Sequence, residues 1–198
     1  MFVITVDQQG SRDAADRVPE LLAALPPVPG LVRAPERTVG DEVQAVLDDA
    51  TGVVELVLHL LRRGGWSVGV GAGPVEEPLP ASSREARGVA FVLARAAVDA
   101  AKSRNRPVPV AVRGADATAA ADAEAVLTLI GAVAARRSAA GWAAIDQARA
   151  LGTERQDAIA QRLGVSQQAV SQRLRAAHWA EESAVRPTAA RLLTAAAG

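Results

Sequence analysis

The chain has 198 residues, of which 49% are hydrophobic and 22% charged, enough to fill the core of one or two globular domains and to exclude wholesale disorder. Cysteine is absent and histidine occurs twice, which excludes disulfides, thiolate catalysis and Cys- or His-rich metal sites. We find no signal-peptide pattern and no run approaching ~20 apolar residues, so we expect a cytoplasmic protein without a membrane span.

The formal net charge is zero, but its distribution is uneven. Residues 1–135 include 13 basic and 17 acidic side chains, whereas residues 136–198 include 9 basic and 5 acidic ones. A small basic module can attract nucleic acid even when the whole chain is neutral.

The first part of the chain alternates strand and helix patterns. A β-rich run at 2–6 ends at Asp7. Gly40-Asp41 separates two β-rich segments and predicts a tight hairpin turn. The other predicted elements are a helix at 13–25, strands at 31–39 and 43–47, and a helix at 50–63.

Glycines mark the next strand, at 66–73, where they alternate with apolar residues. One strand face is therefore nearly bare backbone, and another element must pack closely against it. Ser82-Ser83-Arg84-Glu85 matches a capping box and predicts a helix that reaches about residue 103. A last strand at 108–112 contains Pro109, which confines it to a sheet edge.

These elements predict an α+β protein whose first domain has a ferredoxin-like, cyclase-like βαββαβ fold. After Gly114 the sequence is alanine-rich and free of strand patterns. A long helix is predicted at 118–137, with a buried stripe formed by Val126, Leu129, Ile130 and Val133. The predicted organisation is a domain at 1–114, a connecting helix at 115–137 and an all-α helix-turn-helix domain at 138–198.

The segment 153–176 carries the strongest motif in the chain. Gly164 permits a bend, Ser166 is placed to cap a second helix, and small Ala160 allows that helix to cross closely. The core would consist of Ile159, Leu163, Val165, Val170 and Leu174. This pattern resembles the bacterial helix-turn-helix of sigma-factor region 4 and LuxR-type domains, which implies binding to double-stranded DNA.

The second helix of this motif carries uncharged hydrogen-bonding side chains that suit base edges in the major groove, because Gln can pair bidentately with adenine. Flanking arginines have the reach and charge to contact phosphates. The predicted DNA-binding residues are Ser166, Gln167, Gln168, Ser171, Gln172, Arg162, Arg173 and Arg175. A unit that mediates only protein contacts is the alternative.

A single helix-turn-helix contacts one half-site, so we expect a homodimer. The apolar C-terminal segment at 187–197 is too short to be stable alone. Two interpretations stay open for it: docking on the partner subunit, or packing within its own subunit.

Two N-terminal segments, Asp7-Gln8-Gln9-Gly10-Ser11 and Gly40-Asp41-Glu42-Val43-Gln44, resemble the SatD-like family of bacterial proteins. That family also ends in a helix-turn-helix, so the resemblance extends over nearly the whole chain. The same segments are similar to class III nucleotidyl cyclases, in which one Asp ends the first strand and another lies in the following hairpin.

The cyclase resemblance implies that Asp7 and Asp41 could hold Mg²⁺ or Mn²⁺, with Gly10 and Ser11 offering backbone amides to a nucleotide. The departures from the cyclase pattern are substantial, because Val92 stands where an Asn is expected and Arg95 alone remains of the catalytic pair. We therefore expect a transcriptional regulator with a degenerate cyclase-like domain for dimerisation or ligand sensing. The alternatives are an active metal-dependent cyclase or nucleotidyltransferase, and an ordinary pair of satisfied turn acids.

Overall fold

The computed structural model describes residues 1–11, 14–153 and 155–198, in which the chain forms five strands and eight helices of an α+β fold. The chain divides into two compact units: unit 1 is Met1–Gly131 with Arg186–Gly198, and unit 2 is Ala132–Val185. The sequence-based division, with its boundaries at 114 and 137, kept the C-terminal segment in the helix-turn-helix domain. The contacts instead assign that segment to unit 1.

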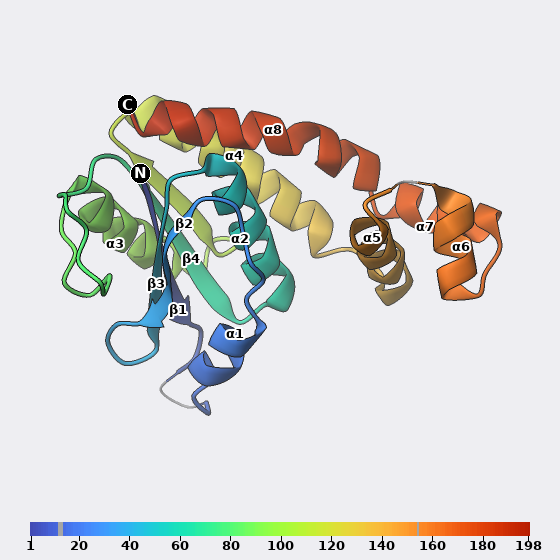
Figure 1. Ribbon diagram of the computed structural model, residues 1–198, viewed down its shortest axis with the longest axis horizontal. Helices are drawn as coiled ribbons and strands as arrows, with labels where there is room; N and C mark the ends of the chain where they lie inside the picture. Colours follow the sequence, from blue (N-terminus) through green and yellow to red (C-terminus); the bar gives the residue numbers. More distant parts are fainter. Residues whose placement is uncertain (12–13, 154) are drawn as a thin grey trace. The chain divides into compact units, whose positions relative to one another are not determined.

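Unit 1 contains a mixed five-stranded sheet in the order β2-β3-β1-β4-β5 (Figure 1). All neighbouring strands are antiparallel except β4 and β5, which are parallel. The central strand β1 is buried from Phe2 to Val6, and apolar there except for Thr5, because both of its faces are covered. The strands are β1 (Phe2–Gln8), β2 (Leu31–Arg37), β3 (Glu42–Leu47), β4 (Trp66–Ala72) and β5 (Val110–Gly114).

Helices cover both faces of this sheet. On one face Ile4 and Val6 lie beside Leu21 of α1 (Val18–Ala24) and Leu56 of α2 (Ala50–Arg63). On the other face Val3 packs against Ala90 and Ala94 of α3 (Val89–Ala101). Two further helices belong partly to this unit: α4 (Ala117–Ala134) and α8 (Trp179–Ala196). Residues 12 and 13, where the first helix was predicted to begin, lie outside the described residues.

The bare face of β4 is confirmed as the site of a close helix contact. A Cβ added to Gly69 would lie 2.2 Å from the Val98 backbone nitrogen, and one added to Gly71 would lie 2.1 Å from the Ala90 carbonyl oxygen. The backbone of α3 therefore rests directly on the backbone of β4, and the glycines make this approach possible.

The predicted capping box at 82–85 is wrong. The Ser82 and Ser83 hydroxyls donate hydrogen bonds to the Glu36 carboxylate of β2, both at 2.8 Å. The helix begins later, at Val89, after Gly88, whose φ of 132° favours glycine. The two serines thus fasten a loop to the edge strand.

The predicted buried stripe of α4 is also wrong in part. Ile130 is buried, but Leu129 is 65% exposed, and Val126 and Val133 are only half-buried. The buried positions are instead Ala120, Ala123, Leu127, Ile130 and Ala134. Among the described helices, α4 is the one long and apolar enough to cross a membrane by length and composition, and 33% of it is buried.

The C-terminal segment packs within its own chain, as one of the two interpretations expected. The Asp116 amide donates to the Ala196 carbonyl at 3.1 Å, and Gly114 lies against the backbone of Ala196. Ala189, Leu193 and Ala196 form the buried side of this part of α8. Pro187 lies inside α8, close to the boundary between the two units.

Unit 2 is all-helical in its described residues and is built from α5 (Ala139–Leu151), α6 (Gln156–Leu163) and α7 (Gln167–Ala176). Ser138 caps α5 by accepting a hydrogen bond from the Gly141 amide at 3.1 Å. Each of the three helices contacts the other two. They share a core of buried residues: Ala144, Ile145, Ala148, Ile159, Ala160, Val170, Leu174 and Ala177.

Candidate functional site

The two helices predicted at 153–176 are α6 and α7, joined by a tight turn. Gly164 has a left-handed φ of 64° and ends α6, which explains the need for glycine at this position. The Ser166 hydroxyl accepts a hydrogen bond from the Ala169 amide at 3.2 Å and so caps α7. Ala160 is buried in the core that α6 and α7 share. Glu154, within the predicted segment, lies outside the described residues.

The outer face of α7 presents the side chains that were predicted to contact DNA. Val170 and Leu174 are buried in the core of unit 2, which fixes the rotation of the helix. The predicted residues that are exposed are Arg162, Ser166, Gln167, Gln168, Gln172 and Arg175. Ser171 and Arg173 are half-buried. The structure therefore leaves most of these donors and acceptors exposed, with Arg162 on α6 and the others at the cap or on α7.

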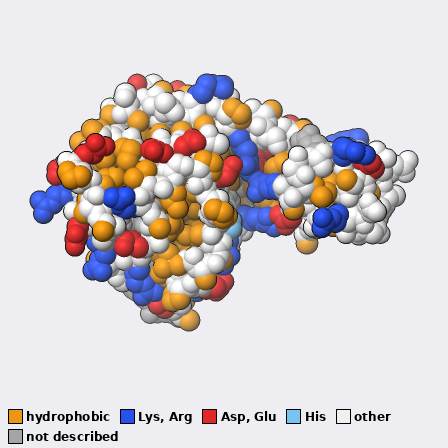
Figure 2. Space-filling view, in the orientation of Figure 1, with side chains coloured by type: hydrophobic (Ala, Val, Ile, Leu, Met, Phe, Trp, Pro, Cys, Tyr) orange, Lys and Arg blue, Asp and Glu red, His pale blue; other side chains and the backbone are white. Residues whose placement is uncertain are grey.

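No Asp or Glu occurs in the sequence between Asp157 and Glu181, whereas three arginines do. Figure 2 shows basic side chains on the surface of this part of the chain, next to many uncharged ones. Asp157, at the start of α6, is paired with Arg155 at 2.6 Å, and hydrogen bonding from Arg155 holds the pKa of its carboxyl below the ordinary value. An excess of arginines over acidic side chains in this segment suits contact with the negatively charged phosphate backbone of DNA.

The second predicted site is a cavity of about 900 Å³ in unit 1. All four residues predicted there, Asp7, Gly10, Ser11 and Asp41, line this cavity. Asp7 comes from β1, whereas Asp41 comes from the turn between β2 and β3, in which Gly40 has a φ of 61°. The antiparallel pairing of β1 with β3 brings these two segments together, since Asp7 lies opposite Glu42.

The loop after β1 is fixed by the buried Gln8 side chain. Its amide nitrogen donates to the Ala15 carbonyl at 2.7 Å, and its amide oxygen accepts from the Arg17 backbone N–H at 2.8 Å. Both bonds therefore hold the far end of this loop, at Ala15 and Arg17, against the end of β1.

The residues present do not fit a divalent-metal centre. The Lys102 ammonium lies 2.7 Å from the Asp7 carboxylate, so this carboxylate already has a cation beside it. The Asp41 Oδ2 atom is buried without a hydrogen-bond partner among the described residues. No group of three or more His, Asp or Glu side chains in the described part of the chain could hold a metal ion. Mg²⁺ usually takes six oxygen ligands, of which one or two are carboxylates and the others are waters or substrate phosphates, so the obstacle here is the Lys102 ammonium beside Asp7 rather than the number of carboxylates.

The two positions of the catalytic pair that the cyclase resemblance implies, Val92 and Arg95, lie on α3. Val92 is 71% exposed and offers no donor for a developing negative charge. Arg95 forms an ion pair with Glu42 of β3 and also lies 4.0 Å from Asp99. Arg95, Asp99 and Lys102 follow one side of α3, and their charges are balanced by each other and by Glu42 and Asp7.

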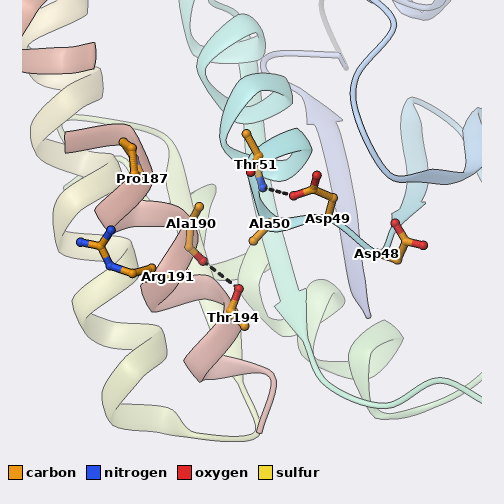
Figure 3. A pocket seen from close by; sticks show the side chains of 8 residues that line it. All are labelled: Asp48, Asp49, Ala50, Thr51, Pro187, Ala190, Arg191 and Thr194. Atoms are coloured by element: carbon orange, nitrogen blue, oxygen red, sulfur yellow. Dashed lines mark hydrogen bonds between the residues drawn. The ribbon is translucent and has the colours of Figure 1, made fainter. Parts of the chain in front are cut away.

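Another pocket, of about 530 Å³, lies between the start of α2 and α8 (Figure 3). Two of its polar side chains already form hydrogen bonds with nearby backbone groups. The Asp49 carboxylate accepts from the Thr51 amide at 2.7 Å, and the Thr194 hydroxyl donates to the Ala190 carbonyl at 3.0 Å. Arg191 points away from α2 in Figure 3. These side chains do not converge on a common ligand position, so we do not treat this pocket as a functional site.

Sequence reasoning missed several side chains of the large cavity, notably Lys102, Arg104 and Arg106. One signal was available, because Lys102 is the only lysine in a chain that otherwise uses arginine. Its pairing with Asp7 depends on α3 lying across β1 and β4, which no local pattern specified.

Comparisons with protein-family models, with curated proteins and with solved structures find no match.

Proposed function

We propose that the protein is a sequence-specific DNA-binding regulator that reads the major groove with α7. The observation that carries the proposal is the set of exposed, uncharged hydrogen-bonding side chains on α7: Gln168 and Gln172 lie opposite the buried Val170 and Leu174, and Gln167 is exposed at the first position of the helix. Glutamine side chains can pair bidentately with adenine, and nearby Arg162 and Arg175 can contact phosphates. The absence of Asp and Glu between Asp157 and Glu181 is consistent with this role.

Unit 1 would serve dimerisation or ligand sensing. The order β2-β3-β1-β4 with antiparallel neighbours supports a ferredoxin-like arrangement, to which β5 adds a parallel edge strand. The position of Asp7 and Asp41 around one cavity supports descent from a cyclase-like site. Membership in the SatD-like family, a cytoplasmic location and the homodimer are further parts of the proposal.

The test is selection of binding sites from a randomised duplex library, followed by titration of the enriched duplex. The wild-type protein should enrich one motif. Replacing both Gln167 and Gln168 with Ala should remove the preference, with a loss of about 1–3 kcal/mol for each bidentate contact. Arg175→Ala should weaken binding to all sequences alike and reduce the salt dependence.

Gln161→Ala is the matched control, because Gln161 is also exposed but lies on α6. It should leave the enriched motif unchanged. If the Gln161 variant loses the motif while the Gln167/Gln168 variant keeps it, α7 is not the recognition helix. If no duplex is enriched, the unit does not read DNA sequence.

The alternative, an active nucleotidyl cyclase, makes a separate prediction. It requires cyclic nucleotide to form from ATP or GTP with Mn²⁺ and to disappear in Asp41→Ala. We expect no product, because Lys102 is paired with Asp7 and Val92 cannot stabilise charge on the transferred phosphoryl group. DNA binding should persist in a folded Asp7→Ala/Asp41→Ala variant.

A further inference from the structure

The strand β5 lies at one edge of the sheet and pairs in parallel with β4. The Val68 N–H of β4 donates to the Pro109 carbonyl at 2.8 Å, so the odd-numbered residues of this ladder turn their backbone groups toward β4. The N–H and C=O groups of Val110 and Val112 therefore point outward from the sheet. Such outward groups of an edge strand are a template on which another strand can pair.

All four of these outward groups are already engaged within the chain. The Val110 N–H donates to the carbonyl two residues before it at 2.9 Å, and the Val110 carbonyl accepts from Arg106 Nη1 at 3.0 Å. The Val112 N–H donates to Glu124 Oε2 at 2.9 Å, and the Val112 carbonyl accepts from Arg113 Nη1 at 2.7 Å. Side chains thus take three of the positions that the backbone of a neighbouring strand would fill.

The three side chains form one charged group, which we name the edge cluster: Arg106, Arg113 and Glu124. The Glu124 carboxylate lies 2.7 Å from Arg106 and 3.0 Å from Arg113, and its side chain is only 18% exposed. Hydrogen bonds that involve ionised groups are stronger than those between neutral groups. Glu124 is the central member, because it contacts both arginines and the strand backbone.

The two edges of the sheet differ in how they discourage pairing. The opposite edge strand, β2, contains Pro35, which has no N–H to offer, and its register with β3 shifts twice. By contrast, β5 begins Val-Ala-Val, and its register with β4 runs without a shift from Val110 to Gly114. A regular strand rich in β-branched residues pairs readily at an edge. It is therefore β5 that needs a separate device.

We infer that the edge cluster keeps β5 closed to strand addition, and that the strand it excludes is β5 of a second copy of the chain. A second copy presents the same regular, β-branched edge, and two such edges can pair antiparallel about a twofold axis. Loss of the Glu124 carboxylate frees the Val112 N–H and removes the shared partner of both arginines. The inference concerns unit 1 alone and does not depend on DNA binding.

Glu124→Ala tests the inference by sedimentation of the full chain at neutral pH. The association constant for self-association should rise on the order of tenfold or more above that of the wild type, because the Val112 N–H is open to pairing. Hydrogen exchange of the Val110 and Val112 amides should slow as the larger species forms. Glu124→Gln is the matched control, since its side-chain oxygen can still accept from the Val112 N–H, and it should sediment like the wild type.

Two further variants keep the test decisive. Arg113→Ala frees the Val112 carbonyl but leaves Glu124 in place, so it should promote association in the same direction even if Glu124→Ala fails to fold. Gly71→Ala disturbs the contact between β4 and α3 and leaves the edge cluster intact, so it controls for a general loss of stability and should not associate.

Folded Glu124→Ala and Arg113→Ala variants that both sediment like the wild type would overturn the inference. So would association that leaves exchange of the Val110 and Val112 amides unchanged, because the contact would then lie elsewhere. Equal association of Gly71→Ala would assign the effect to partial unfolding instead.

Discussion

Arg137 and Glu182 form an ion pair of 2.6 Å in which the two side chains are only 1% and 4% exposed. The Arg137 Nε atom also donates to the Ala177 carbonyl at 2.7 Å, and its guanidinium lies 4.8 Å from the centre of the Trp142 ring. Arg149 approaches the same glutamate at 3.4 Å. This network joins α5, the end of α7 and the start of α8 around the core of unit 2.

We predict that Arg137→Ala destabilises unit 2 by about 3–5 kcal/mol, because removing one partner leaves a buried charge poorly compensated. Hydrogen exchange of the backbone amides in α5, α6 and α7 should report the change. Arg155→Ala is the matched control, since the Arg155–Asp157 pair is exposed and should contribute little. Equal acceleration of exchange in both variants would show that the buried pair has no special role.

The contact between β4 and α3 gives a second prediction. Gly71→Ala would put a methyl group 2.1 Å from the Ala90 carbonyl oxygen, so strand and helix must separate. Overpacking of a core typically costs about 1–3 kcal/mol, and we expect the free energy of unfolding to fall by an amount at or above the upper end of that range. Urea denaturation measures this change. Gly73→Ala is the control, because its nearest neighbours would be 3.6 Å away, in ordinary contact. Similar losses in both variants would contradict the close-packing explanation.

Where the pattern of one segment determined its structure, the sequence was a sufficient guide. The hairpin at Gly40, the helix at 50–63 and the cap at Ser166 each depend on neighbouring residues, and each is found where it was predicted. The bare face of β4 was also predicted, although its partner α3 was not.

The failures involve contacts between distant segments. Ser82 and Ser83 match a helix cap locally, but Glu36 is 46 or more residues away and takes both hydroxyls. In α4 the periodicity was ambiguous, because alanines supply the buried side and larger residues such as Leu129 lie outside. The Lys102–Asp7 pair depends on tertiary packing, so the candidate metal site could be located from the sequence but its chemistry could not.

Glu124 predicts a specific acid sensitivity of unit 1. Burial alone would raise the pKa of its carboxyl, but hydrogen bonds from the Val112 N–H and from Arg106 outweigh that effect and hold the pKa below the ordinary value of 4.5. A carboxyl with a lowered folded-state pKa stabilises the fold above its unfolded-state pKa. This contribution is lost as the pH falls through the folded-state pKa.

We therefore expect Glu124→Gln to be less stable than the wild type near neutral pH, with the difference shrinking below about pH 4.5. Urea midpoints measured across this pH range provide the test. Glu55→Gln, which changes an exposed carboxyl of α2, is the control. Its urea midpoints should differ from those of the wild type by the same amount at every pH. A Glu124→Gln difference that is independent of pH would assign the effect to packing alone.

The pairing of Lys102 with Asp7 leads to the last prediction, on divalent cations. The ammonium repels a second cation and competes for the Asp7 oxygens at 2.7 Å. We expect weak or absent Mn²⁺ binding to the wild type and an increase in affinity on the order of tenfold in Lys102→Gln, because one nearby positive charge is removed. Isothermal titration with MnCl₂ measures this.

Lys102→Arg keeps the charge and should show no gain in Mn²⁺ affinity. Adding Asp41→Asn to Lys102→Gln should abolish the gain, because the buried Asp41 Oδ2 is the other carboxylate oxygen available in the cavity. If Lys102→Arg binds Mn²⁺ as well as Lys102→Gln does, then electrostatic competition at Asp7 is not the reason for weak binding. Tight binding by the wild type would reopen the possibility of a metal-dependent enzyme, since Asp7 would then have to leave Lys102 for the ion.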